Sequence, residues 1–344
     1  MKKLKNRYEF MFLVEAAGCN PNGDPDMGNL PRQDEDTGLG YITDVALKRR
    51  LRDYIDDAYG TEEHMQILMR KGTSLSEKIA EGVLETNGID KFPSNFVNNK
   101  VAETEAYMED RYWDVRTFGG VLSTGRNAGQ VRGAVQIAGS NFSIDPIQPK
   151  NITITRMCYI DKNDKNYSTL EEYKKAVEKY PDDQKRTMGT KQFVPYGLYL
   201  VRGSVSACIA QKTGFTTDDL DKLFEAITQM YNHGISSSKE GMSVVGPVII
   251  FKHIGTQAPE NEEQNKKEGM LGCAPAHKLF SLLNIRKKDG VLTPRQYKDY
   301  DVTLNVSGIP TGVCVGFKSM PFEPVVWYDA KRDDQYTGLD ITLR

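Results

Sequence analysis

The first hydrophobic pattern in the chain predicts a β-strand followed by a helix. Residues 8–16 are rich in aromatic and branched side chains, and a stretch dense in Gly, Asn, Pro and Asp follows them. After a polar loop to about Tyr41, apolar residues recur at helical spacing at positions 47, 51, 54, 55 and 58. Thr43 or Asp44 can cap this helix, which we expect to run to about Ala58.

Two insertions are predicted next. Helical patterns over residues 62–70, 75–85 and 101–115, separated by Gly and Asn, indicate a helical lobe. Strand signals resume over residues 131–142. A second insertion, from about residue 146 to 195, contains a strand-like segment at 152–160, a polar turn, a short helix at 170–180 and a charged stretch. Its composition is typical of an exposed protrusion.

The second half of the chain returns to a packed core. Alternation over residues 198–209 predicts a half-buried strand, and Thr216 with Asp219 forms a capping box before an amphipathic helix. The apolar run 242–251 predicts a buried strand, with a helix at 275–283 and a strand at 301–306 after it. Without the insertions the order is β-α-β-β-α-β. We therefore predict an α+β fold of the ferredoxin-like type, which RNA-recognition domains also use.

Composition narrows the function classes only partly. The chain has 344 residues, enough for one large core with insertions or for two domains. Its five cysteines are scattered without a CxxC pair and its four histidines lack metal-ligand spacing, so we predict no disulfide framework, no metal site and no cofactor. With no apolar run of membrane-spanning length, we expect a cytoplasmic protein. A net charge of −2 leaves room for a basic groove, because the acidic residues are clustered.

Basic residues in the first predicted helix allow two interpretations. Helical geometry places Arg49 near Asp53 and leans Arg50 toward Asp57, which is typical of a solvated helix with ion pairs. Alternatively, Lys48 and Arg49 contact phosphates that arrive along the loop after the first strand.

Two glycine-rich loops could also approach a phosphate chain. Residues 123–132 include Arg126 and Arg132, and residues 234–241 include exposed hydroxyls with Lys239. A plain flexible loop in the first case, and a helix end with a turn in the second, are the structural alternatives.

The end of the protrusion carries large apolar side chains in a polar setting, in the stretch Met188-Gly-Thr-Lys-Gln-Phe-Val-Pro-Tyr196. Such a side chain can wedge between bases, or Phe193 can instead pack the foot of the protrusion onto the core.

The stretch Asn20-Pro-Asn-Gly-Asp-Pro-Asp26 suggests a metal loop, but it fails the EF-hand pattern because Gly18 stands at the first ligand position. An Asp-rich turn remains as the simpler interpretation, and an Asp there could still position a ribose or a metal for RNA cleavage.

Taken together, several segments resemble the Cas-seven backbone subunits of the type I-C CRISPR Cascade complex, members of the RAMP superfamily. The resemblance spans nearly the whole chain, in the expected order. The segments that carry it are Asn20-Pro-Asn-Gly-Asp-Pro-Asp26, Ile42-Thr-Asp-Val-Ala-Leu-Lys-Arg-Arg50, Asp114-Val-Arg-Thr-Phe-Gly119, Gln130-Val-Arg-Gly-Ala-Val-Gln136, Pro195-Tyr-Gly-Leu-Tyr199 and Lys239-Glu-Gly-Met242.

This resemblance implies a hand-shaped, non-catalytic protein. The palm would be RNA-recognition-like and comprise residues 1–58, 116–145 and 197–344, with helical fingers at 59–115 and a thumb hairpin at 146–196. Copies would line up head to tail on the spacer of the guide RNA (crRNA), and each thumb would displace a base. Further partners would be the target DNA strand, the Cas-five and Cas-eight type subunits and the small subunit.

The family's RNA contacts carry over to matching positions of this chain. The RNA backbone would be contacted by Asn20, Asn22, Lys48, Arg49, Arg126, Arg132, Ser238 and Lys239. Phe193 would wedge at the displaced base, with Met188 beside it. The aromatic signature of ordinary RNA-recognition sheets is missing from the sequence, so we predict no base stacking on the sheet face.

Two rival hypotheses remain. The chain could be a metal-dependent RAMP ribonuclease that uses Asp24 or Asp26, although the sequence offers neither a histidine general acid nor paired metal ligands. It could also be a purely structural filament subunit, whose oligomers would form without RNA.

Overall fold

The computed structural model describes residues 2–156, 158, 161, 164–182, 185–234, 236–328 and 341–343. Within these residues, nine strands form one large sheet whose pairings are antiparallel. The main order is β15-β14-β11-β1-β10-β8-β4, and β7 and β9 also pair with β10. The strands are β1 (Tyr8–Cys19), β4 (Leu39–Thr43), β7 (Val135–Ile137), β8 (Ser140–Pro146), β9 (Lys150–Arg156), β10 (Thr187–Val205), β11 (Met242–His253), β14 (Val313–Lys318) and β15 (Val326–Tyr328).

Both faces of the sheet are buried. Along β1, Phe10, Phe12 and Val14 belong to one hydrophobic cluster, whereas Met11 and Leu13 belong to another. Side chains alternate between the two faces of a strand, so a strand that is covered on both sides reads as a continuous apolar run. This explains why the first strand is the strongest hydrophobic segment of the N-terminal region.

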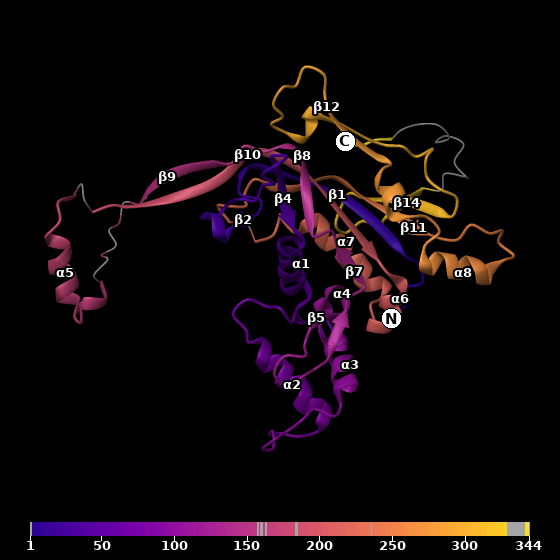
Figure 1. The fold of residues 1–344 in the computed structure, drawn as a ribbon, viewed down its shortest axis with the longest axis horizontal. Helices are drawn as coiled ribbons and strands as arrows, with labels where there is room; N and C mark the ends of the chain where they lie inside the picture. The colour runs from indigo at the N-terminus through magenta and orange to yellow at the C-terminus, as the bar shows by residue number, and fades with distance from the viewer. Residues whose placement is uncertain are drawn as a thin grey trace.

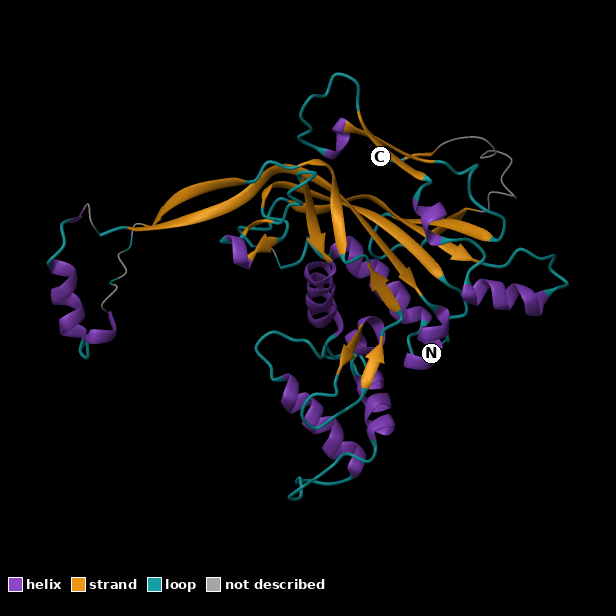
Figure 2. Cartoon of the chain, in the orientation of Figure 1, coloured by secondary structure: helices purple, strands orange, loops and turns teal. Residues whose placement is uncertain are grey.

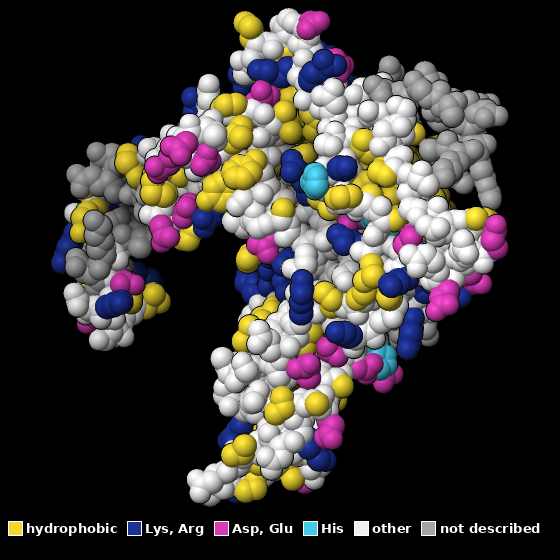
Figure 3. Space-filling view, turned by 45° about the vertical axis from the view of Figure 1, so that its right-hand side comes forward, with side chains coloured by type: hydrophobic (Ala, Val, Ile, Leu, Met, Phe, Trp, Pro, Cys, Tyr) yellow, Lys and Arg dark blue, Asp and Glu magenta, His cyan; other side chains and the backbone are white. Residues whose placement is uncertain are grey.

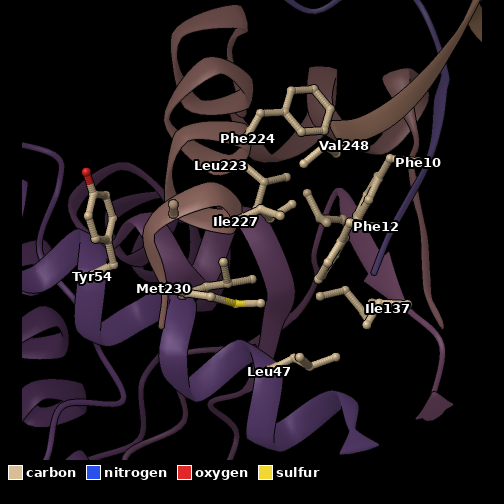
Figure 4. Packing of buried hydrophobic residues seen from close by; sticks show 14 of the residues in the cluster. Phe10, Phe12, Leu47, Tyr54, Ile137, Leu223, Phe224, Ile227, Met230 and Val248 are labelled. Atoms are coloured by element: carbon tan, nitrogen blue, oxygen red, sulfur yellow. The ribbon is translucent and has the colours of Figure 1, made fainter. Parts of the chain in front are cut away.

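Helices cover one face of the sheet (Figure 1, Figure 4). α1 (Asp44–Tyr59) begins as predicted, because the Thr43 hydroxyl accepts a hydrogen bond from the Ala46 backbone N–H at 3.3 Å. α7 (Thr217–Gln229) begins at the predicted capping box of Thr216 and Asp219. Their buried side chains meet those of β1 in the first cluster. The alternation and capping signals of the sequence therefore located the core correctly.

A small second layer covers the other face of the sheet. It consists of a three-stranded sheet, β12 (Leu283–Lys287), β13 (Tyr300–Leu304) and β16 (Ile341–Thr342), together with α9 (Ala276–Phe280). α8 (Glu262–Leu271) lies beside the end of β11. None of the helices in the described part of the chain is both long and apolar enough to cross a membrane.

A helical lobe projects from the sheet (Figure 1). It contains α2 (Leu75–Asn87), α3 (Val101–Arg111), α4 (Trp113–Phe118) and the hairpin of β5 (Gly119–Val121) and β6 (Gln130–Arg132). Its hydrophobic cluster includes Leu122, Ala128 and Val131, so its core extends past residue 115.

The helix predicted over residues 62–70 is wrong: this segment consists of turns and loops. Its backbone groups find partners outside a helix, because the Asp114 carboxylate accepts from the N–H of Leu68 and Met69 while the Lys78 amine donates to the carbonyls of Ile67 and Leu68. Tertiary hydrogen bonds thus replace those that a helix would have supplied.

The second projection is a long hairpin (Figure 1, Figure 2). β9 pairs with the first part of β10 from Arg156 opposite Thr187 to Lys150 opposite Phe193, and α5 (Leu170–Glu178) lies beyond its end. β10 then continues into the sheet and ends at Val205. The strand predicted to reach Ile209 is therefore too long, because Ser206 caps α6 (Ala207–Thr213).

Short elements complete the described fold. β2 (Gly23–Asp24) and β3 (Leu30–Pro31) form a small hairpin in the loop after β1, with the 3-10 turn Pro25–Met27 between them. Two further 3-10 turns are Asp164–Asn166 and Tyr297–Asp299.

Candidate nucleic-acid interface

The loop after β1 is held in place by its two predicted asparagines. The backbone N–H of Asn20 donates to the Ser238 carbonyl at 2.9 Å, and its side-chain amide donates to the Asn29 carbonyl. The Asn22 side-chain oxygen accepts from the backbone N–H and the hydroxyl of Thr43, each at 2.9 Å. The Asn22 amide therefore fastens the loop to the start of α1, and the Asn20 backbone fastens it to the loop before β11.

Lys239 joins the same two loops. Its ammonium group donates to the backbone carbonyls of Asn20 and Pro21. Burial, and to a lesser extent the nearby charge of Arg50, lowers the pKa of Lys239 to about 8. Ser238 is exposed, and its hydroxyl lies 3.3 Å from that of Ser236. The structure thus brings Asn20, Ser238 and Lys239 together, and their contact with RNA stays a prediction.

An open basic pocket lies beside this junction. It has a volume of about 380 Å³, and four cations face a single carboxylate in it. Figure 3 shows Lys and Arg side chains gathered in the hollow between the hairpin and the helical lobe. The lining residues are Pro21, Ala46, Arg49, Arg50, Asp53, Lys71, Tyr231 and Lys239.

The cations of this pocket differ in whether they form ion pairs with carboxylates of the protein. Arg49 pairs with Asp53 at 2.5 Å, as the helical spacing predicts. Arg50 does not pair with Asp57, which instead contacts His233 at 2.7 Å. Within the described ranges, Arg50 and Lys71 make no ion pair. An excess of unpaired cations in a recess attracts a phosphate group.

Sequence reasoning missed Arg50 and Lys71 as members of this pocket. The helical spacing directs Arg50 toward Asp57 on its own helix, and Lys71 directly follows the segment 62–70 for which a helix is predicted. The available signal was the absence of an acidic residue four positions from Arg50, since Tyr54 and Ala46 occupy those places.

Lys48 does not line the pocket. Its ammonium group lies 2.8 Å from the Asp44 carboxylate and 5.6 Å from the centre of the Phe118 ring. The side chain is 14% exposed. This geometry favours the ion-pair interpretation for Lys48, and its contact with RNA stays a prediction.

The arginines of the first glycine-rich loop belong to the lobe. Arg126 stacks over the Phe92 ring at 3.9 Å, and Arg132 is an exposed residue of β6. Gly119 lies opposite Arg132 in the pair of β5 with β6, and a Cβ there would lie 2.4 Å from the Val131 carbonyl oxygen. This close approach of the two strands requires glycine at position 119.

Met188 and Phe193 both lie on the hairpin, opposite Thr155 and Lys150 of β9. Met188 is 76% exposed, whereas Phe193 is half-buried. They are five positions apart along an unbroken register, so their side chains point to opposite faces of the hairpin. They cannot act together on one base.

Asp24 is occupied within the loop. Its carboxylate lies 3.1 Å from the Arg32 guanidinium and accepts a hydrogen bond from the Asp26 backbone N–H. In the part of the chain that the structure describes, no group of three or more His, Cys, Asp and Glu residues is placed to hold a metal ion.

Comparison with known proteins shows which family the chain resembles. The model of a family described as "CRISPR-associated protein Cas7" matches residues 6–305. A CRISPR-associated protein Cas7 of Haloferax volcanii is 41% identical over 121 residues, which are 34% of this chain and 33% of the relative. The alignment thus spans about a third of that relative.

Among solved structures, the chain is similar to a subunit of a pre-nicking CRISPR RNA-guided surveillance complex, with a TM-score of 0.43, 16% identity and coverage of 72% of this chain and 76% of that one. A second CRISPR RNA-guided surveillance complex gives a TM-score of 0.41, 13% identity and coverage of 75% and 74%.

Proposed function

This chain belongs to the family of CRISPR-associated protein Cas7, and from that premise we propose that it binds crRNA as a backbone subunit of a type I-C surveillance complex. Copies of it would line up along the spacer. The protein would hold the sugar-phosphate chain without reading the bases, so that recognition of the target DNA strand rests on pairing.

The strand order supports a ferredoxin-like palm. The strands β11, β1, β10 and β7 are neighbours in that order, and α1 and α7 share one face of the sheet. This is the arrangement expected when β-α-β-β-α-β units fold antiparallel. We propose the helical lobe as the fingers and the hairpin with α5 as the thumb, close to the ranges given from the sequence.

The observation that carries the proposal is the basic pocket between α1 and the two fastened loops. Arg50 and Lys71 supply unpaired cations, and Lys239 and Arg49 complete the wall. Exposed Arg132 would extend the contact toward the lobe, and Phe193 at the root of the hairpin would meet the displaced base. We propose Asn20, Asn22 and Ser238 as residues that shape this track.

The partners follow from the proposed assembly. They are crRNA, the target DNA strand through the guide, other copies of the chain, the Cas-five and Cas-eight type subunits and the small subunit. No cofactor and no catalytic residue are part of the proposal.

RNA binding tests the proposal. The purified chain should retain single-stranded RNAs of unrelated sequence with similar affinity, and binding should fall steeply with added salt. Arg50→Ala and Lys71→Ala should each weaken binding of every RNA. Each should also flatten the plot of log affinity against log salt by about 0.7, the value for one phosphate contact to a single strand.

Two further variants serve as controls. Lys222→Ala removes an α7 lysine that pairs with Asp218 outside the pocket, and it should leave RNA affinity unchanged. Lys48→Ala decides between the two interpretations of Lys48, because a change in the salt slope would assign it to the track. Failure of the unmodified chain to retain RNA at low salt, or binding of one spacer only, would reject the proposal.

A further inference from the structure

α5 is held away from the body of the protein (Figure 1). Seven residue pairs join β9 to the start of β10, which corresponds to roughly 20 Å of paired strand at 3.3 Å per residue. Beyond it, α5 belongs to none of the three hydrophobic clusters of the described chain. The helix is nevertheless well built, with a capping box between Thr169 and Glu172.

One face of α5 is apolar and exposed. Leu170, Tyr173 and Val177 recur at i, i+3 and i+7, so they form one stripe. They are 70%, 40% and 38% exposed. A hydrogen bond from the Tyr173 hydroxyl to the Asp164 carbonyl, 2.9 Å long, holds the stripe in a fixed orientation. A preformed apolar stripe on an isolated helix marks a docking element.

A complementary groove lies between α7 and the segment 318–327. Its volume is about 740 Å³, and Leu220, Phe224, Phe322 and Trp327 contribute apolar walls. The charged residues that line it are Asp221, Glu225, Glu323, Lys252 and Lys318. Phe322 is 82% exposed and Trp327 is 41% exposed. In Figure 1, α5 lies at one end of the longest axis of the molecule, and β14, from which this segment continues, lies toward the other end.

We propose that the apolar stripe of α5 in one copy of the chain seats in the groove of the next copy. This inference rests on the proposed assembly of copies along RNA. A surface and its complement at opposite ends of one chain form a head-to-tail contact, which repeats into an open array instead of closing into a dimer. Recognition would follow the helix-in-groove mode, with anchors at i, i+3 and i+7.

The charges of α5 favour a second copy of the chain over a nucleic acid as the partner of the stripe. Residues 170–179 carry three glutamates and three lysines, so the helix has no net charge to attract phosphates. Lys174 lies one step around the helix from the stripe. Three carboxylates line the groove against two ammonium groups, so a stripe that enters it would bring Lys174 to a lining with an excess of negative charge.

Self-association without RNA tests the contact directly. In sedimentation velocity at high protein concentration, the unmodified chain should form a ladder of species. Leu170→Asp with Val177→Asp removes the stripe, and Phe322→Asp spoils the groove, so each variant alone should be monomeric. An equal mixture should form dimers and nothing larger, because only one intact stripe can meet one intact groove. An unmodified chain that stays monomeric, or a mixture without dimers, overturns the proposal.

Charge reversal gives an independent test on RNA. On a long RNA that holds several copies, Lys174→Glu and Asp221→Lys should each lower the cooperativity of loading severalfold, and the chain with both changes should recover it. Lys175→Glu, on the far flank of α5, is the matched control and should load normally. Singles that load like the unmodified chain, or a double variant no better than either single, overturn the proposal.

Affinity for a short RNA that holds one copy reports on the proposed function alone. All of these variants should bind that RNA as the unmodified chain does. Loss of binding by the unmodified chain would therefore count against RNA binding, while the dimer test without RNA would still decide the contact between copies.

Discussion

Replacing Arg116 should destabilise the protein more than any change at its surface. The Arg116 guanidinium contacts both oxygens of the Asp219 carboxylate, at 2.7 and 3.2 Å. The two side chains are only 4% and 2% exposed. Arg116 also donates to the carbonyls of Glu109 and Asp110, and Asp219 closes the capping box of α7. The pair therefore joins the helical lobe to the helix layer of the sheet.

The magnitude follows from what remains after the change. Arg116→Met fills most of the space but leaves the Asp219 carboxylate buried without its counter-charge. Loss of one partner of a buried pair costs about 3–5 kcal/mol. Total stabilities of about 5–15 kcal/mol make this a large fraction. A second variant, Arg116→Met with Asp219→Ser, removes the stranded charge and keeps a capping side chain, so it should be more stable than Arg116→Met alone.

Urea unfolding followed by circular dichroism measures these differences. Lys266→Ala provides the control, because Lys266 and its partner Glu262 are 66% and 74% exposed, and such surface pairs contribute about 0–1 kcal/mol. The reasoning is refuted if Arg116→Met costs no more than Lys266→Ala, or if the double variant is less stable than the single one.

Four further predictions concern Lys239, the hairpin and Asp24. Because burial lowers the pKa of Lys239 to about 8, the charge of Lys239 and the affinity for RNA should both fall as pH rises from 7 to 9. Lys239→Met should bind RNA more weakly at pH 7, and its affinity should not show this pH dependence. Filter binding at several pH values measures both effects. The same shift lowers the free energy of unfolding below about pH 8, because the folded state disfavours the charged Lys239 side chain. This cost should disappear between pH 8 and 10.5, so stability against urea should rise with pH over that range. Lys239→Met should make this rise smaller. Phe193→Ala should keep most RNA affinity but abolish the chemical reactivity of displaced bases, whereas Met188→Ala, on the opposite face of the hairpin, should leave those bases displaced. Incubation of RNA with the assembled complex and Mg²⁺ should give no cleavage; cleavage that Asp24→Asn abolishes would establish the ribonuclease alternative.

Local signals in the sequence were sufficient for much of the core. The cap at Thr43, the capping box at Thr216 and the apolar spacing of both helices depend on residues within a few positions of one another. The ion pair of Arg49 with Asp53 is equally local, because both residues lie on one helix. Such features can be read without knowledge of the fold.

The errors have a common physical origin in contacts between distant residues. Residues 62–70 have a helical pattern, yet Asp114 binds the backbone at Leu68 and Met69 from more than forty positions away. The basic pocket likewise combines α1 with Lys71 and Lys239, which come from separate loops. No periodicity of a single sequence encodes such a meeting, so the joining of Arg50 and Lys71 in one pocket is visible only in the folded chain.

The same long-range contacts connect the fold to the candidate site. The segment Asp114-Val-Arg-Thr-Phe-Gly119 contributes to the family resemblance, but its charges serve the interior: Asp114 binds Arg52 and Arg116 binds Asp219. By fixing the backbone at Leu68 and Met69, Asp114 sets the course of the chain that leads to Lys71. The buried Asp114 carboxylate therefore helps to position an unpaired cation of the pocket. A phosphate-binding site requires its cations to be held where no carboxylate of the protein neutralises them.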